Sequence, residues 1–414
     1  MDFCEILREK MATAFGCTEP VALAYAASRA KYILGENPKK IHAKLSGNII
    51  KNANSVKVPG TDGRKGIEIS LAVGAFLGDY TKKLEVISTV DKSKLEYMDE
   101  LIKNGLIGVE LDYDKVGLYI DVLMEGDGAN SEVIISGYHT NIVYERLNNR
   151  VLLDKRCENN NEDKLKDLDF DKIYDFAMMG DYSSIIGILD KEITYNYSIS
   201  KEGIENKWGA CIGQILLSES EDKPIERYIA YAAAGSDARM SGCEKPVVIN
   251  SGSGNQGITI SVPIISYCKD NNCKKDELYR GLIFANLLAI YIKDGIGELS
   301  AYCGVVSAGA CAIAGIAFIK KEKKEVIKNT IINALAINSG LLCDGAKESC
   351  AGKIASSLKV ANMAYIQAKT GNTFKNKDGI VKDDVDKMIE TIGNIAKQGM
   401  IETDRVILNE MINS

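Results

Sequence analysis

Three cysteines are the residues of this chain whose spacing points most clearly to chemistry: Cys303, Cys343 and Cys350. They are separated by 39 and by six residues, and their neighbours are mainly Gly, Ala and Ser, which let a backbone approach a bulky inorganic group closely. This pattern is typical of an iron-sulfur cluster held by distant segments and not of a zinc ribbon. Three thiolates leave one iron open to substrate, so the pattern predicts an enzyme. Three buried structural thiols are the alternative.

A further cysteine, Cys17, is expected at the start of a helix. Residues 2–35 predict two helices, and the segment FGCTEP interrupts the first, which we expect to continue past Met11. Thr18 is a suitable cap for the second helix. Unpaired N–H groups and the positive end of the helix dipole there lower the pKa of a thiol. Cys17 is therefore a candidate base, nucleophile or ligand, and a small buried side chain is the alternative.

Two polar segments could hold a substrate. The segment SGNIIKN follows the strand-like IHAKL, and its backbone N–H groups and polar side chains suit a carboxylate. The alternative is an ordinary helix cap. The segment NSGSGNQG has the glycine spacing of a dinucleotide fingerprint, but it continues into the β-branched ITISVPIISY, where we expect no helix, so we exclude that site. Its side chains are better interpreted as a polar pocket wall near the cysteines. The candidate substrate-binding residues are Ser46, Asn48, Asn52, Ser253, Asn255 and Gln256.

The chain has only two histidines, His42 and His139, which excludes HExxH and other histidine-rich metal sites. His139 is expected on a strand, where it could be a general acid or a partner for the substrate carboxylate. A structural histidine is the alternative. No Walker A sequence, G-x-S-x-G elbow or zinc-finger spacing is present in the sequence.

The periodicity of the sequence predicts an α+β protein. Strand and helix signals alternate between residues 40 and 200, including a strand at LEVIST and a polar loop over residues 156–172. Beyond residue 200 the segments are helical, beginning with KWGACIGQILLSE, and several are apolar on all sides, as in buried central helices. We therefore expect a mixed α/β domain with a sheet over residues 1–200, which carries Cys17 and the SGN segment. A helical iron-sulfur domain is expected over residues 201–414.

The composition excludes several functional classes. Lys plus Arg (51) against Asp plus Glu (57) gives a net charge of −6, and no basic stripe with aromatic residues is present, so we expect no nucleic-acid partner. The apolar run over residues 303–319 predicts a buried helix and not a membrane span. The N-terminal residues do not have the pattern of a signal peptide, and 11 cysteines suit a reducing compartment, so we expect a cytoplasmic protein. The large apolar helices are compatible with a homodimer.

Four motifs, taken in order, resemble those of the L-cysteine desulfidases, relatives of the iron-sulfur L-serine dehydratases. They are FGCTEPVALA, SGNIIKN followed by PGT, NSGSGNQG followed by SVP, and CDGAKESCAGK, and the likeness covers nearly the whole chain. The resemblance implies an oxygen-sensitive 4Fe-4S cluster bound by Cys303, Cys343 and Cys350, with the fourth iron free. It also implies that Cys17 is the base that removes the α proton. The implied reaction converts L-cysteine and water to pyruvate, ammonia and hydrogen sulfide without pyridoxal phosphate.

Three alternatives stay open at this point. The first is an iron-sulfur L-serine dehydratase, although the closely spaced second cysteine of CDGAKESC and the absence of cysteine from RVILNEMINS favour cysteine as substrate. The second is a non-enzymatic iron-sulfur protein that carries sulfur or senses iron. The third is a binding protein for a small amino acid without a metal.

Overall fold

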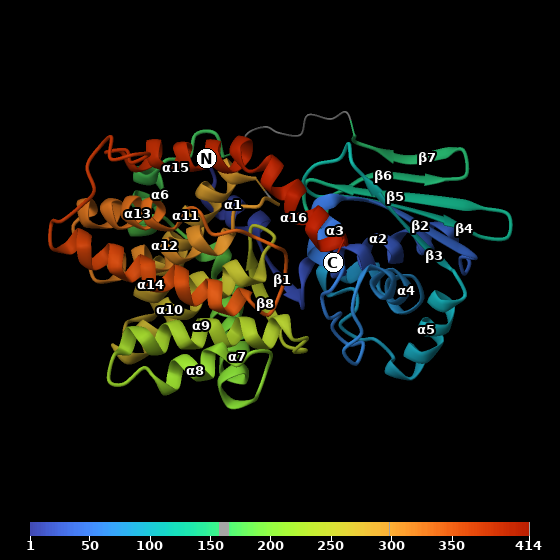
Figure 1. Cartoon of the computed structure of the whole chain (residues 1–414), viewed down its shortest axis with the longest axis horizontal. Helices are drawn as coiled ribbons and strands as arrows, with labels where there is room; N and C mark the ends of the chain where they lie inside the picture. The colour runs from blue at the N-terminus through green and yellow to red at the C-terminus, as the bar shows by residue number, and fades with distance from the viewer. Residues whose placement is uncertain (157–164, 298, 414) are drawn as a thin grey trace.

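The structure, a computed structural model, describes residues 1–156, 165–297 and 299–413 and confirms the predicted α+β class. Figure 1 shows the two main parts side by side. The sheet part comprises residues 16–156, and the helical part comprises residues 1–15 together with the described residues from 165 onward. Most of the predicted polar loop over residues 156–172 lies outside the described residues.

A six-stranded sheet forms one layer of the sheet part, and its strand order is β3-β2-β4-β5-β6-β7. Strands β2 and β3 are parallel and the other neighbours are antiparallel. Alternate side chains of β4 are buried because one face of the sheet packs on helix α2. The strands are β2 (Lys40–Ser46), β3 (Ile107–Asp112), β4 (Tyr119–Glu125), β5 (Asn130–Ser136), β6 (Ile142–Leu147) and β7 (Arg150–Asp154).

Four helices complete the sheet part: α2 (Thr18–Leu34), α3 (Gly47–Ala53), α4 (Ile67–Leu77) and α5 (Leu95–Lys103). Helix α2 lies between the sheet and α4, as Figure 1 shows, and is buried along most of its length. It is rich in alanine, so α4 approaches it closely. This helix begins directly after Cys17, and its packing therefore fixes the position of that thiol.

The helical part is built around helix α12, whose residues from Val305 to Phe318 are all buried. Helices α10, α11, α13 and α14 pack around it, which confirms the predicted buried central helices. In the part of the chain that the structure describes, no helix is long and apolar enough to span a membrane. The helices are α6 (Phe170–Met179), α7 (Ile186–Glu205), α8 (Ile212–Ser218), α9 (Pro224–Met240), α10 (Gly254–Asp270), α11 (Lys275–Ile296), α12 (Gly304–Ile319), α13 (Lys324–Asn338), α14 (Cys350–Lys369), α15 (Val385–Asn394) and α16 (Ile401–Asn413).

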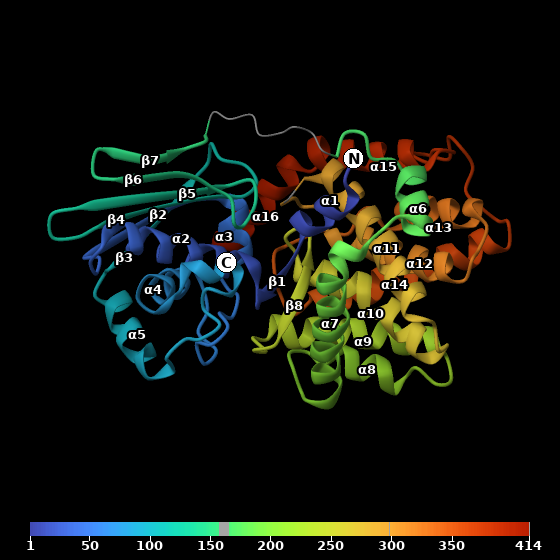
Figure 2. The ribbon, with the colours of Figure 1, turned by 180° about the vertical axis from the view of Figure 1, so that it is seen from behind.

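Both ends of the chain connect the two parts. Helix α1 (Phe3–Lys10) and strand β1 (Met11–Phe15) belong to the helical part, where β1 pairs antiparallel with β8 (Pro246–Asn250). The chain then enters the sheet part at Cys17, and α16 returns at its end to contact α3, as Figures 1 and 2 show from opposite sides. The domain boundary that we predicted at residue 200 separates two folding units, and it stays a prediction.

Several sequence expectations are wrong in detail. The helix predicted past Met11 is a strand, because β8 offers a pairing edge that a local pattern cannot reveal. The segment LEVIST forms helical turns, and residues 207–211 precede α8 as turns. His139 lies in the turn after β5 and not on a strand. Helix α10 begins at Gly254, inside NSGSGNQG, and continues through the β-branched segment with Pro263 inside it, because burial among neighbouring helices outweighs the weak intrinsic helix preference of this segment.

The close approach of α2 and α4 gives a test of this packing. A Cβ atom on Gly74 would lie 2.3 Å from the carbonyl oxygen of Ala24, so we expect Gly74→Ala to lower the free energy of unfolding by about 1–3 kcal/mol. Gly187→Ala is the matched control, since a Cβ atom on this helical glycine meets nothing within 4 Å. Chemical denaturation of both variants measures the difference, and equal stabilities would show that the helices do not approach as described.

Candidate active site

Backbone pairing brings two of the three cysteines together. Cys303 caps the N-terminus of α12, and its N–H donates to the carbonyl of Leu341 at 3.0 Å. The N–H of Cys343, in the loop after α13, donates to the carbonyl of Ala301 at 2.7 Å. The thiols of Cys303 and Cys343 are hydrogen-bond partners, and Cys350, the first residue of α14, lies within electrostatic range of both. The three predicted ligands therefore share one site.

The electrostatics of this site favour a thiolate at Cys343. The hydrogen bond from Cys303 lowers the pKa of Cys343 to about 6 in spite of its burial, and the positive charges of Lys51 and Lys353 add to the shift. The same hydrogen bond, together with burial, raises the pKa of Cys303. Since metal ions bind thiolates, Cys343 is prepared for ligation at neutral pH.

The surroundings of the cysteines fit an iron-sulfur group. Among the described residues, no three His, Cys, Asp or Glu side chains converge as ligands of a single metal ion. A cluster does not require this convergence, because each thiolate binds a different iron. A Cβ atom on Gly304 would lie 2.8 Å from the side-chain amide of Gln256, and one on Gly345 would lie 2.9 Å from Oδ1 of Asn52. Both amide oxygens are buried without a hydrogen-bond partner, so polar acceptors border this cradle.

Cys17 is the N-cap residue of α2, as predicted, and is buried. Its thiol donates to Oε2 of Glu19 at 3.3 Å. Nε2 of His139 lies 3.6 Å from the other carboxylate oxygen of Glu19 and is buried without a hydrogen-bond partner. The first turn of α2 and the turn after β5 thus place the Glu19 carboxylate between the Cys17 thiol and the His139 imidazole.

The protonation state of Cys17 differs from the one that we expected for a thiol at the start of a helix. Burial and the negative charge of Glu19 raise the pKa of Cys17, while the positive charge of Arg239 acts in the opposite direction. Although burial favours the neutral acid, the imidazole of His139 lowers the pKa of Glu19 to about 2. In the protein as described, Cys17 is therefore a neutral thiol that donates to a carboxylate, and the expected lowering of its pKa is wrong.

Two basic residues lie at this site: Arg239, which the sequence did not single out, and Lys347 of the CDGAKESC segment. Arg239, in the last turn of α9, is buried, and its guanidinium donates to the carbonyl of Gly16 at 2.9 Å. Burial lowers the pKa of Lys347, whereas Asp344 and, after it, the nearby cysteines raise it. The side chain of Gln256 lies against Gly304, next to Cys303, and Arg239 joins Asn255 to Gly16, so contacts connect the start of α2 with the cysteine set.

The predicted substrate-binding residues divide into two groups. Asn52 and Gln256 have unpaired amide oxygens beside the cysteine segments, whereas the hydroxyl of Ser46 donates to the carbonyl of Gly117 at 2.6 Å. Asn48 uses both ends of its amide, since it accepts from the N–H of Gly117 at 3.0 Å and donates to Asp404. The SGN start of α3 is thus occupied by contacts within the protein.

Buried polar groups hydrogen-bond to the second polar segment, NSGSGNQG, and support it. The hydroxyl of Ser253 caps α10 by accepting from the N–H of Gln256 at 3.3 Å, and Asn255 accepts from Arg239 at 3.2 Å. Beneath the segment, Asn250 donates to Asn286 at 2.8 Å, and Asn286 donates to the carboxyl group of Glu192 at 3.0 Å. Burial raises the pKa of Glu192 to about 8, so this supporting acid is neutral at neutral pH.

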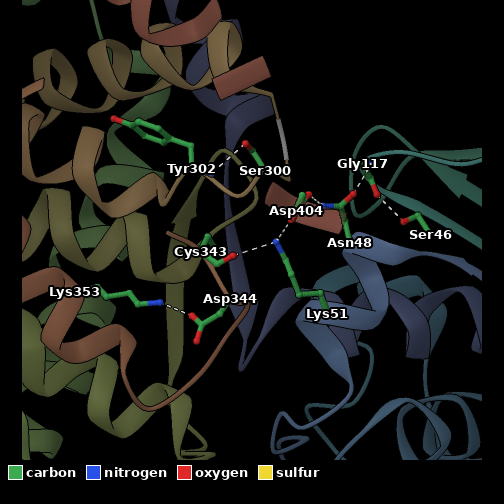
Figure 3. A network of polar contacts seen from close by, with 10 residues as sticks. All are labelled: Ser46, Asn48, Lys51, Gly117, Ser300, Tyr302, Cys343, Asp344, Lys353 and Asp404. Carbon is green, nitrogen blue, oxygen red and sulfur yellow. Dashed lines mark hydrogen bonds and ion pairs between the residues drawn. The ribbon is translucent and has the colours of Figure 1, made fainter. Parts of the chain in front are cut away.

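A buried lysine connects the two parts of the molecule beside the cysteines (Figure 3). Lys51 of α3 is 2% exposed, and its ammonium donates to the carbonyl of Cys343 at 3.1 Å and pairs with Asp404 of α16. Lys353 pairs with Asp344 on the other side of the loop. A cavity of about 500 Å³ lies next to this network, between α16 and the start of α3, but no cysteine lines it.

Removing Asp404 tests this connection. We expect Asp404→Ala to lower the free energy of unfolding by about 3 kcal/mol, because it leaves the Lys51 ammonium buried without its counter-charge. The matched control is Arg405→Ala, since this exposed neighbour should change the stability by less than about 0.5 kcal/mol. Denaturant unfolding measures both, and the double variant Lys51→Met/Asp404→Leu should recover much of the loss. A single variant as stable as its control would contradict the role of the pair.

The acidity of Cys17 gives a second test. Alkylation of Cys17 in the metal-free protein should be slow at neutral pH, and Glu19→Gln should speed it about tenfold for each unit by which the pKa of the thiol falls. Glu68→Gln, in the first turn of α4, is the control and should have no effect. Mass spectrometry of the peptide that carries Cys17 gives the rates. Unchanged alkylation in Glu19→Gln would show that the carboxylate does not act on the thiol.

Comparisons with known proteins agree with this site. Residues 81–409 match the family described as serine dehydratase alpha chain. The chain is 43% identical over 419 residues to a protein of Finegoldia magna, covering 99% of each chain. It is 42% identical over 416 residues to a protein of Desulfitobacterium hafniense, covering 99% of this chain and 96% of the other. Both relatives are described only as UPF0597 proteins. The chain therefore belongs to the serine dehydratase alpha chain family, whose members are iron-sulfur lyases.

Proposed function

We propose that the protein is a cytoplasmic L-cysteine desulfidase, which converts L-cysteine and water to pyruvate, ammonia and hydrogen sulfide. The observation that carries the proposal is the series of contacts between the two cysteine regions: Gln256 lies against Gly304, next to Cys303, and Arg239 joins Asn255 to the carbonyl of Gly16, next to Cys17. These contacts support a proton-transfer group and a metal-binding group acting on one substrate, which β-elimination from an amino acid requires. The family membership supports an iron-sulfur lyase, and the sequence motifs support cysteine as its substrate.

We assign the cluster ligands to Cys303, Cys343 and Cys350. A 4Fe-4S cluster bound there with an open iron would supply a Lewis acid for the sulfur of the substrate. Around it, the chain provides the buried acceptors Asn52 and Gln256, which suit the ammonium group of an amino acid. Cys17, Cys303 and Cys350 are buried, so charges interact more strongly there than in water.

Proton removal is assigned to Cys17. Its thiol is neutral in the free protein and donates to Glu19, and the positive charge of Arg239 favours the thiolate that proton removal requires. The thiolate then takes the α proton of the substrate as sulfide leaves from the β carbon. The resulting aminoacrylate becomes an imine, which water hydrolyses to pyruvate and ammonia.

Anaerobically reconstituted protein should produce pyruvate and sulfide in equal amounts from L-cysteine over many turnovers. Cys17→Ser should retain the thiolate-to-iron absorbance and lose turnover by at least about 10²-fold, since general-base catalysis contributes this much. Cys303→Ala, Cys343→Ala and Cys350→Ala should each lose the absorbance. Cys311→Ala is the matched control, because this buried cysteine lies within α12, the helix that Cys303 precedes, and is not one of the predicted ligands.

Other outcomes separate the alternatives. Pyruvate from L-serine without sulfide from L-cysteine would identify an iron-sulfur L-serine dehydratase, which the family description favours. Sulfide in a stoichiometric amount only would indicate a sulfur carrier. Loss of the absorbance in Cys17→Ser would make Cys17 a ligand and overturn its assignment as the base.

A further inference from the structure

We propose that Arg239 binds the α-carboxylate of the substrate and thereby selects ligands that carry this group beside the amine. The inference rests on the proposed function only for the identity of the ligand as an α-amino acid. The evidence is that the Arg239 side chain is buried and only partly hydrogen-bonded, and that it lies between Cys17 and the polar segment NSGSGNQG.

The guanidinium of Arg239 is buried and only partly satisfied. The residue is 4% exposed, and it donates one bond to the carbonyl of Gly16 and one to Oδ1 of Asn255. Its Nε is buried without a hydrogen-bond partner, although a guanidinium carries five N–H donors. Both partners are neutral oxygens, so neither supplies a negative charge.

Other arginines of the protein contrast with this one. Arg29, Arg64 and Arg146 each pair with a carboxylate, at 2.7, 2.7 and 2.6 Å, although they are more exposed than Arg239. Within the described ranges of the chain, Arg239 has no such ion pair. A buried charge without a counter-charge costs several kcal/mol, and a planar guanidinium suits a carboxylate particularly well. An anion from outside the chain would remove this cost.

The position of Arg239 fits a carboxylate next to the reacting carbon. The guanidinium holds the carbonyl of Gly16, the residue before Cys17, and its charge acts on the Cys17 thiol. A Cβ atom on Gly254 would lie 2.4 Å from Nε, so a glycine there leaves the room that the guanidinium needs. A carboxylate bound at Arg239 would lie near Cys17, because the same guanidinium holds Gly16, and Gln256, whose buried oxygen is unpaired, follows Asn255 in the chain.

Binding and turnover in the cluster-loaded protein test the proposal. In Arg239→Gln, we expect kcat/KM for L-cysteine to fall about 100-fold, mainly through KM, and kcat/KM for L-cysteinamide to fall less than about fivefold. Arg29→Gln is the matched control and should leave the preference for the carboxylate intact, because Arg29 pairs with Glu145 away from this site. Arg239→Lys keeps the charge and tests the planar donors if the glutamine variant does not fold.

A second measurement is independent of turnover. Calorimetry should show that the wild-type protein binds L-alanine more tightly than L-alaninamide, and that Arg239→Gln removes this difference. This result would support the inference even if L-cysteine were not turned over, in which case only the proposed function would fail. Equal losses for L-cysteine and L-cysteinamide, or a wild-type protein without preference for L-alanine, would overturn it. A change in the alkylation rate of Cys17 with unchanged binding would instead assign Arg239 to the thiol alone.

Discussion

The buried ammonium of Lys51 is the interaction on which the arrangement of this molecule depends. It joins three segments that are far apart in sequence: α3 of the sheet part, the loop of Cys343, and Asp404 of the last helix. A lysine that is 2% exposed is stable only if it keeps its partners, so the sheet part, the cysteine loop and α16 must fold together. The cysteine set is therefore completed by the sheet part and is not a property of the helical part alone.

A second connection lies at the other end of the chain. Strand β1 pairs with β8, and the chain then passes through Gly16, whose carbonyl Arg239 holds, into Cys17. Gly16 has a φ of +79°, and a Cβ atom there would lie 1.8 Å from the ring of Pro59. Only glycine allows the chain to turn at this point without strain. Both connections thus converge near the cysteines, where the two parts of the molecule share their buried polar groups.

Local sequence patterns predicted the structural features that depend on interactions between residues close together in the sequence. The helix start at Cys17, the strands from β2 to β7 and the buried α12 follow from capping residues and from apolar periodicity, which act within a few residues. The pairing of β1 with β8 involves residues more than 200 positions apart, so a strand at Met11 could not be separated from a continued helix. Burial likewise made a helix of the β-branched segment before Pro263.

The candidate site likewise has residues that the local sequence pattern identifies and residues whose role depends on the fold. Cysteines in small-residue surroundings are conspicuous in a sequence, whereas Arg239, Lys51 and Asp404 resemble ordinary surface charges until the fold buries them. Glu19 is an ordinary first-turn acid by its position in the sequence, and only the fold brings it into contact with Cys17 and His139. A sequence signal did exist for one of these, since Gly254 beside a polar segment marks a close approach, but it did not identify the arginine.

The positive charges at the candidate site lie near the thiols whose ionisation they favour. Three thiols meet in one buried place, and the hydrogen bond between Cys303 and Cys343 lowers the pKa of Cys343 while it raises that of Cys303. Lys51 and Lys353 both lower the pKa of Cys343, so the chain supplies part of the positive charge that ligation completes. Arg239 lies apart from these two lysines, at the Cys17 end of the site. The positive charge of the site is thus divided between the cysteine loop, where Lys51 and Lys353 act on Cys343, and the start of α2, where Arg239 acts on Cys17.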